Sequence, residues 1–103
     1  MTSKFSVGDL VVKGKPVKKS FQNAFTKAQA TKIWVDRGAG VGKNPMTGVS
    51  VQLNPLEMSI YMWILVWYRC YEAGQMLTPI SVFDNMRYLF SELNTEAYYD
   101  LVD

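Results

Sequence analysis

Residues 53–74 constrain the fold more than any other part of the chain, because they form a long apolar segment with a helix signal at each end. Asn54 is suited to accept a backbone N–H as an N-cap, and Pro55 suits the first helical position. Glu57 lies three residues after Asn54, where it completes a capping box and faces the positive end of the helix. Gly74 supplies the left-handed residue that ends a helix. The sequence therefore predicts one helix over this stretch.

This predicted helix is apolar on nearly every side. Its apolar residues form two stripes, one made of Leu56, Ile60, Trp63 or Ile64, Trp67 and Cys70 or Tyr71, the other of Met58, Tyr61 or Met62, Leu65 and Tyr68. A helix of this kind either lies at the centre of a core or is covered by a partner. One interpretation is a central helix wrapped by the rest of the chain. The other is self-association or binding of a partner protein through Tyr61, Trp63, Trp67 and Tyr68.

The same helix is too short in its apolar part to cross a membrane. The uninterrupted apolar run covers residues 60–68, far fewer than the ~20 residues that a bilayer requires. Its aromatic residues are spread through the run and do not flank it as a belt. We therefore expect no contact with a membrane.

Positive and negative charges are segregated between the two halves of the chain. Residues 1–50 carry nine lysines and arginines against Asp9 and Asp36, a net charge of +7. Residues 51–103 carry two arginines against seven acidic residues, a net charge of −5, which leaves +2 for the whole chain. Such a division is typical of a basic nucleic-acid surface beside an acidic face. It equally indicates two halves that attract each other, within one chain or head to tail between chains.

The basic residues of the N-terminal half are candidates for binding phosphates or the acidic surface of a partner. Three aromatic residues interleaved with them, Phe21, Phe25 and Trp34, are suited to stack on bases. No helix-turn-helix, zinc or RNP signature indicates sequence-specific readout, and a basic face exposed only to solvent is the alternative. The predicted nucleic-acid or acidic-partner surface consists of Lys13, Lys15, Lys18, Lys19, Lys32, Arg37 and Lys43.

Residues that commonly carry catalysis are missing or unsuitably placed. The chain has no histidine, which removes the commonest general base and metal ligand along with Ser-His-Asp and Cys-His catalysis. Its lone Cys70 falls in the apolar helix and is expected to be a packing residue. Residues 38–44 invite comparison with a phosphate-binding loop, but Arg37 stands where that motif needs glycine and Asn44 where it needs Ser or Thr. We therefore expect a non-enzymatic protein with no catalytic, cofactor-binding or metal-binding residue.

The N-terminal half predicts short strands and one helix. A strand is expected within residues 5–13, and a helix with an apolar face over residues 20–31. Residues 32–36 have the β-branched and aromatic composition of a second strand. They are expected to pair with residues 49–53 across a long glycine-rich loop.

The C-terminal half predicts two further helices after the long one. Thr78 is expected to cap, and Pro79 to open, a helix that runs to about Leu93. The short link before it favours an antiparallel pair with the preceding helix. Thr95 then begins a short third helix.

Together these elements predict an α+β fold in a single domain over residues 1–103. A short N-terminal strand pair with a basic loop packs on a C-terminal helical hairpin plus a short terminal helix. Residues 1–52 form the basic half, rich in strands and loops, and residues 53–103 form the helical half.

Two phrases in the last half of the chain, NPLExxIYxW at residues 54–63 and FxxxNxxAYxxLxD at residues 90–103, resemble small uncharacterised proteins of tailed bacteriophages. The resemblance carries over no catalytic residue and implies a virus-encoded binder of a host or phage protein. We therefore expect a small protein-binding or self-associating protein, with a small nucleic-acid-binding protein as the alternative. The lone cysteine and the absence of an apolar signal core indicate the cytoplasm, that of a host cell if the protein is phage-encoded.

Overall fold

The computed structural model describes residues 3–102, and the elements in this part of the chain make an α+β fold. In chain order they are η1 (Val7–Asp9), β1 (Val11–Val12), β2 (Lys15–Pro16), α1 (Lys19–Gln29), β3 (Gly40–Lys43), β4 (Ser50–Leu53), α2 (Pro55–Glu72), α3 (Ile80–Leu93) and α4 (Thr95–Leu101). The strands form two separate antiparallel hairpins, β1–β2 and β3–β4. The predicted fold class is confirmed, including the C-terminal helical hairpin and the short terminal helix.

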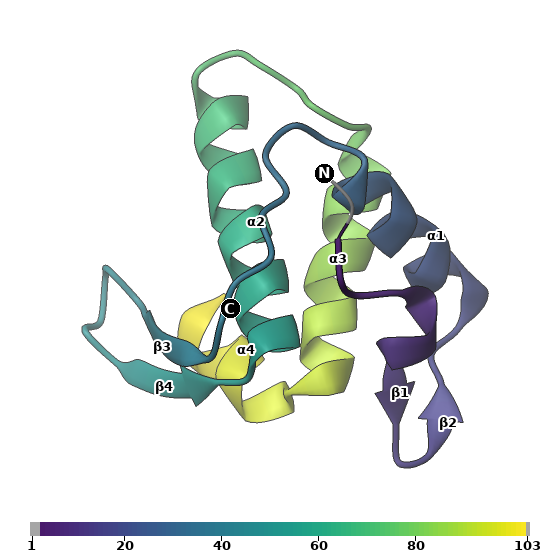
Figure 1. Cartoon of the computed structure of the whole chain (residues 1–103). Helices are drawn as coiled ribbons and strands as arrows, with labels where there is room; N and C mark the ends of the chain where they lie inside the picture. The colour runs from purple at the N-terminus through teal and green to yellow at the C-terminus, as the bar shows by residue number, and fades with distance from the viewer. Residues whose placement is uncertain (1–2, 103) are drawn as a thin grey trace.

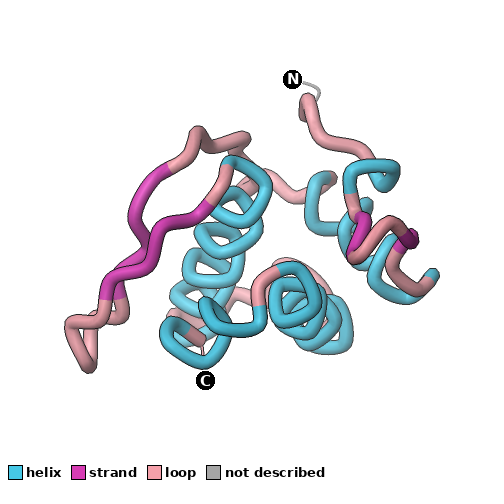
Figure 2. The backbone as a smooth tube through the Cα atoms, turned by 90° about the horizontal axis from the view of Figure 1, so that it is seen from below, coloured by secondary structure: helices cyan, strands magenta, loops and turns pink. Residues whose placement is uncertain are grey.

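Helix α3 lies in the middle of the molecule, with α2 on one side and α1 on the other (Figure 1). The short link after α2 makes α2 and α3 an antiparallel pair. Helix α4 folds back beneath this pair, and the β3–β4 hairpin lies against α2 and α4. Seen from below, the β1–β2 hairpin and α1 lie on the other side of the helix pair from β3–β4 (Figure 2). The two hairpins are therefore on opposite sides of the molecule.

Helix α2 begins and ends at the predicted residues. The Asn54 side chain accepts a hydrogen bond from the Glu57 N–H at 2.8 Å, and the Glu57 carboxylate accepts one from the Asn54 N–H at 3.1 Å. Pro55 occupies the first turn, where its missing N–H leaves nothing unsatisfied. Gly74 has a φ of 89°, the left-handed conformation expected just after a helix. The predicted capping box is confirmed.

The prediction that Thr78 caps the next helix is wrong. Helix α3 has Pro79 at its N-cap position and no side-chain cap. The Thr78 hydroxyl instead accepts a hydrogen bond from the Trp67 indole N–H at 2.9 Å and donates one to the Pro79 carbonyl at 3.0 Å. The Thr78 hydroxyl therefore bonds the indole of a buried tryptophan and does not cap the N-terminus of α3.

The prediction of a strand over residues 32–36 is also wrong, because side chains hold this segment in an irregular path. The Trp34 ring meets Phe25 edge-on with centroids 5.4 Å apart, and its indole N–H donates to the Asp36 carboxylate at 2.8 Å. Strand β4 pairs instead with β3, in a register that runs from Gly40↔Leu53 to Lys43↔Ser50. Within residues 5–13 only Val11–Val12 is a strand, since Val7–Asp9 forms a 3-10 turn.

Strand β3 comes from the glycine-rich stretch that the sequence suggested as a loop. A Cβ atom on Gly42 would lie 2.8 Å from Leu101 Cδ1 and 3.0 Å from Leu53 Cδ1. Any larger residue at this position would displace the ends of these two leucine side chains, so glycine lets β3 lie this close to them. The glycines at this point serve packing, which removes the remaining similarity to a phosphate-binding loop.

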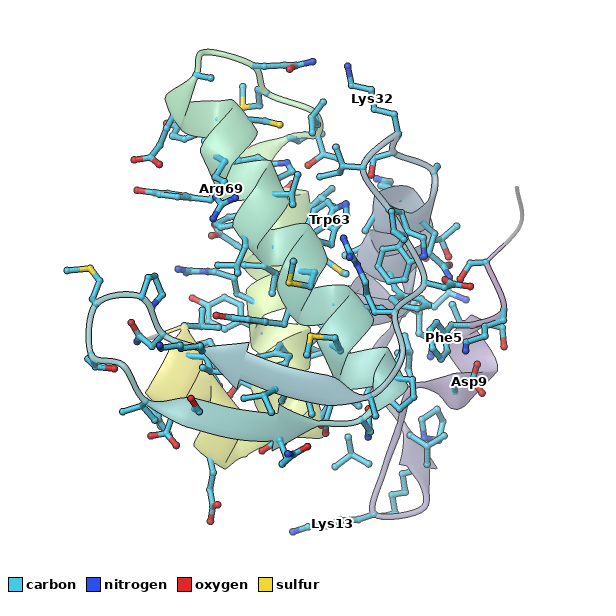
Figure 3. All side chains as sticks on the ribbon, turned by 60° about the vertical axis from the view of Figure 1, so that its left-hand side comes forward. Phe5, Asp9, Lys13, Lys32, Trp63 and Arg69 are labelled. Atoms are coloured by element: carbon cyan, nitrogen blue, oxygen red, sulfur yellow. The ribbon has the colours of Figure 1, made fainter. Side chains whose placement is uncertain are left out.

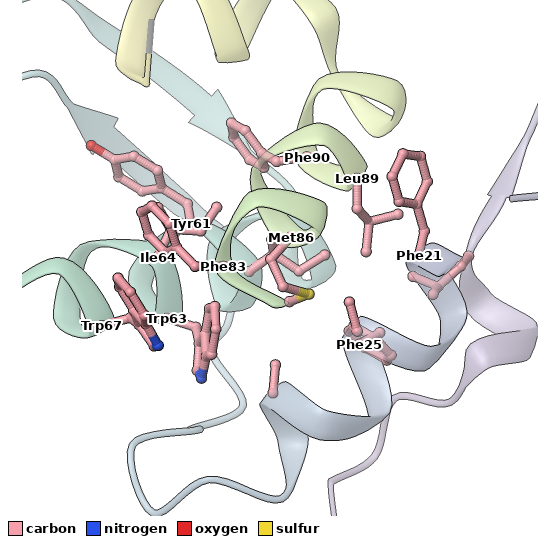
Figure 4. Close-up of a cluster of buried hydrophobic side chains, with 14 of the residues drawn as sticks. Phe21, Phe25, Tyr61, Trp63, Ile64, Trp67, Phe83, Met86, Leu89 and Phe90 are labelled. Atoms are coloured by element: carbon pink, nitrogen blue, oxygen red, sulfur yellow. The ribbon is translucent and has the colours of Figure 1, made fainter. Parts of the chain in front are cut away.

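The central helix is α3, so the interpretation of α2 as a central helix wrapped on all sides is wrong. Helix α2 is covered by its own chain on one face, which carries its largest buried rings (Figure 4), and it leaves Tyr68 and Tyr71 exposed on the other. Tyr61, Trp63 and Trp67 are each 2% exposed or less. Buried tyrosine and tryptophan need a hydrogen-bond partner for their polar atom, and each of these has one in the same chain. The bonds run from Trp63 Nε1 to Thr31 Oγ1 (2.9 Å), from the Tyr61 hydroxyl to the Lys43 carbonyl (3.2 Å), and from Trp67 Nε1 to Thr78 Oγ1.

Candidate interaction surfaces

The structure separates the four rings that the sequence placed on one interaction surface. Tyr61, Trp63 and Trp67 are core residues and cannot contact a partner without unfolding. Tyr68 is 49% exposed and remains available. Of the four predicted contact residues, only Tyr68 therefore remains as a candidate for binding a partner.

Tyr68 belongs to an exposed aromatic cluster that joins α2 to α3. The Tyr68 ring stacks on Phe83 with centroids 6.3 Å apart, and Tyr71, also exposed, stacks on Trp67 at 5.4 Å. Phe83 and Trp67 stack on each other at 4.2 Å. The two exposed tyrosines are thus supported from below by buried rings, so they present their faces with little conformational freedom to lose on binding.

A cavity of about 310 Å³ opens beside this cluster, between α2, α3 and α4. We call it the α2–α3–α4 groove. A volume of this size is at the lower end of the range for ligand pockets, roughly 300–1,000 Å³. Its lining is aliphatic and aromatic apart from one arginine, and consists of Ile64, Leu65, Tyr68, Phe83, Arg87, Leu101 and Val102.

Arg87 is the cation of the groove, and its position is fixed by rings. Its guanidinium carbon lies 5.5 Å from the centroid of Phe83 and 5.9 Å from that of Tyr88. Its Nη2 lies 3.5 Å from Asp84 Oδ1, which is the single ion pair found within residues 3–102. A contact of this length, between partly exposed groups one helical turn apart, is weak. Arg87 therefore retains donors for a carboxylate that approaches from outside.

Sequence reasoning missed Arg87, Tyr71, Phe83 and Tyr88 as members of this surface. A signal was present for Arg87, because it lies on the apolar stripe of its helix, which otherwise consists of Ile80, Phe83, Met86 and Phe90. An arginine on an apolar helix face lies at the border of the core, where its aliphatic part packs against apolar residues and its guanidinium reaches solvent. No sequence signal places its neighbours from α2 and α4 around it.

The predicted basic surface is brought together only in part. Lys13 lies at the tip of the β1–β2 hairpin and Lys32 beyond the other end of α1 (Figure 3). Lys43 is on β3, on the opposite side of the molecule, and Arg37 is in the segment that links α1 to β3. Lys27 of α1 lies between the two ends. We call basic face the set Lys13, Lys15, Lys18, Lys19, Lys27 and Lys32, all of them exposed.

The two carboxylates of the N-terminal half are used locally. Asp9 accepts a hydrogen bond from the Ser6 N–H at 2.8 Å. Burial by itself raises the pKa of Asp36. Hydrogen bonds from the Ser3 hydroxyl, the Lys4 N–H and the Trp34 indole outweigh it and hold that pKa below its ordinary value. Asp36 is thus an ionised anchor for the segments on either side of it.

The aromatic residues predicted to stack on bases are not available for stacking. Phe21 is 3% exposed and Phe25 is fully buried, both facing the core from α1 (Figure 4). Trp34 is half-buried, with its ring edge against Phe25 and its indole N–H bonded to Asp36. The basic face therefore presents lysines without an aromatic platform.

Over residues 3–102 no group of three or more cysteine, aspartate and glutamate side chains is placed to hold a metal ion. Within the same range, none of the helices has the length and apolar character needed to cross a membrane. No family model matches the chain, and neither a curated protein nor a solved structure is significantly similar to it.

Proposed function

We propose that this chain is a non-enzymatic protein-binding protein and that its α2–α3–α4 groove receives a segment of the partner. The segment places a large apolar side chain in the groove and a carboxylate on Arg87. The observation that carries this proposal is that an exposed tyrosine and an arginine, both held in place by aromatic rings, stand at one apolar cavity.

The energetics of such a site favour binding. Tyrosine and arginine are among the residues that dominate the free energy of protein–protein association, and they act best beside a pocket that excludes water. Tyr68 and Arg87 are already packed on aromatic rings, so less side-chain entropy is lost when a partner orders them. A carboxylate complements the one cation of the groove, and the apolar lining of Leu65, Leu101 and Val102 excludes water around the pair.

The proposal extends to the biological setting that the resemblance implies. A phage-encoded accessory factor would use the groove on a host or phage protein in the cytoplasm of the host cell. The phrase that carries part of the resemblance, residues 54–63, supplies the first half of α2, which positions the groove without lining it.

The test selects peptides from a displayed library of random sequences on the wild-type chain and measures their affinity for variants. We expect the selected peptides to share an aromatic or large aliphatic residue close to an aspartate or glutamate. Tyr68→Ala and Arg87→Gln should each weaken binding by about 10-fold or more, as hot-spot residues do. Arg69→Gln is the matched control, because Arg69 is an exposed arginine of α2 that does not line the groove.

Two results contradict the proposal. One is that no peptide is selected at all, and the other is that the selected peptides bind all three variants equally well. Light scattering on the same proteins identifies the partner further. A dimer that dissociates in Arg87→Gln but not in Arg69→Gln identifies a second copy of the chain as the partner.

A further inference from the structure

The six lysines of the basic face are not held in ion pairs by the rest of the described chain, although Glu92 lines a surface pocket together with Lys15 and Lys18. Asp9 and Asp36, the acidic residues nearest in sequence, are held in local hydrogen bonds. Helix α1 itself contains no acidic residue. Apart from Lys18, whose ammonium lies 4.6 Å from the Phe21 ring centroid, the charges of this face are directed mainly to solvent or to a partner.

The lysines are spread along a line and do not converge on a point. Lys19 and Lys27 are eight residues apart on the exposed side of α1, which is about 12 Å along a helix axis. The hairpin extends the line to Lys13 at one end, and Lys32 continues it past the other (Figure 3). Duplex nucleic acid carries one negative charge per roughly 1.7 Å of its axis, so this line can face several phosphates.

Lys13 occupies a backbone conformation that lysine rarely adopts. It has a φ of 53° and Gly14 a φ of 80°, so both central residues of the two-residue β1–β2 turn are left-handed. Asparagine or glycine is the usual residue at the first of these positions. A lysine there adds charge at the most protruding point of the basic face in spite of the strained backbone.

The burial of the aromatic rings that are interleaved with these lysines decides which nucleic acid fits. Proteins that hold single strands stack successive bases on aromatic side chains, and Phe21 and Phe25 are buried. The higher charge density of a duplex favours a surface made of lysines alone. We infer that the basic face binds the phosphate backbone of double-stranded nucleic acid without reading its sequence. This inference goes beyond the proposed function, because the basic face lies on α1 and the β1–β2 hairpin, on the opposite side of α3 from the groove.

The experiment measures fluorescence anisotropy of a labelled DNA duplex of about 24 base pairs across a salt series, with an equally long oligothymidylate as the single-stranded probe. Each lysine that neutralises a phosphate contributes about −0.9 to the slope of log K against log salt concentration. Six lysines should therefore give a slope no steeper than about −5. Two duplexes of unrelated sequence should bind equally, and both should bind more tightly than the single strand.

The variant Lys19→Gln/Lys27→Gln should reduce the steepness of the slope by about 2, because two phosphate contacts are lost. Lys43→Gln on the opposite hairpin is the control and should leave the slope unchanged. Circular dichroism of both variants verifies that the helices are intact. The inference is overturned if the slope is unchanged in the double variant or if the single strand binds more tightly. It is also overturned if polyglutamate of equal charge competes as well as the duplex does, which identifies an acidic protein as the partner.

Discussion

Lys13 shows how a single residue can oppose local stability. The left-handed conformation costs an L-residue other than glycine or asparagine roughly 1–2 kcal/mol. We predict that Lys13→Asn raises the free energy of unfolding by about 0.5–1 kcal/mol, because it creates the Asn-Gly pair that the turn prefers. The same change should weaken duplex binding. Urea unfolding and anisotropy on one protein preparation measure both effects.

A variant that gains stability and keeps full affinity would show that the charge of Lys13 is irrelevant to binding. A variant that loses stability would show that Lys13 makes favourable contacts not evident from its backbone. Lys13→Gly is the useful companion. Glycine relieves the same backbone conformation but gains freedom in the unfolded chain, so its stability should fall below that of the asparagine variant.

The buried aromatic residues show which part of the core a sequence leaves undecided. The spacing of Trp63 and Trp67 predicts an apolar helix face, but not whether one chain or two cover it. The answer depends on Thr31, which accepts from Trp63 across 32 positions of the chain, and on Thr78, which accepts from Trp67. These hydrogen bonds form between residues far apart in the sequence, so the residues next to each threonine do not predict them.

At the level of elements, the helix ends could be predicted and the strand partners could not. The capping box of α2 is a local device in which residues three apart bond each other, so it is visible in the sequence. Strand β3 comes from a glycine-rich stretch without strand-like composition, and Gly42 of this strand packs against Leu101, nearly sixty residues away. Residues 32–36 have strand-like composition, yet the contacts of Trp34 outweigh that preference.

The capping box of α2 allows a direct measurement. Asn54→Ala should lower the free energy of unfolding by about 0.5–2 kcal/mol, because the Glu57 N–H loses its acceptor. Glu57→Gln should cost less, about 0.3–1 kcal/mol, since it keeps a side-chain acceptor and loses only the interaction of its charge with the helix dipole. Denaturant unfolding measures both variants. If Glu57→Gln leaves stability unchanged but abolishes peptide binding, the glutamate is a contact residue and the interaction surface reaches the start of α2.

At the level of the whole molecule, the segregation of charge along the sequence becomes a segregation in space. The two halves of the chain meet through apolar side chains, with Phe21 and Phe25 of α1 and Met86 and Leu89 of α3 in one core. No ion pair joins the halves within residues 3–102. The lysines of the basic face therefore have no partner within ion-pair distance and are available to an external anion.

The arrangement of the helices also separates the two proposed surfaces. The groove is lined by Phe83 and Arg87 on the side of α3 that faces α2 and α4, whereas α1 and the basic face lie on its other side. The groove and the basic face share no residue. The two ligands therefore do not compete for the same side chains.

We therefore predict that the two surfaces bind independently. Duplex affinity measured with and without a saturating groove-binding peptide should differ by less than about 2-fold, because sites without a shared two-state element have no coupling free energy. The peptide chosen should carry no net charge beyond its single carboxylate, so that it does not compete electrostatically with the duplex. Arg87→Gln should weaken the peptide complex by about 10-fold or more and leave duplex affinity unchanged. Lys19→Gln/Lys27→Gln should weaken duplex binding and leave peptide affinity unchanged. If the peptide and the duplex exclude each other, they bind overlapping surfaces, and the prediction of two independent binding sites on opposite sides of α3 is wrong.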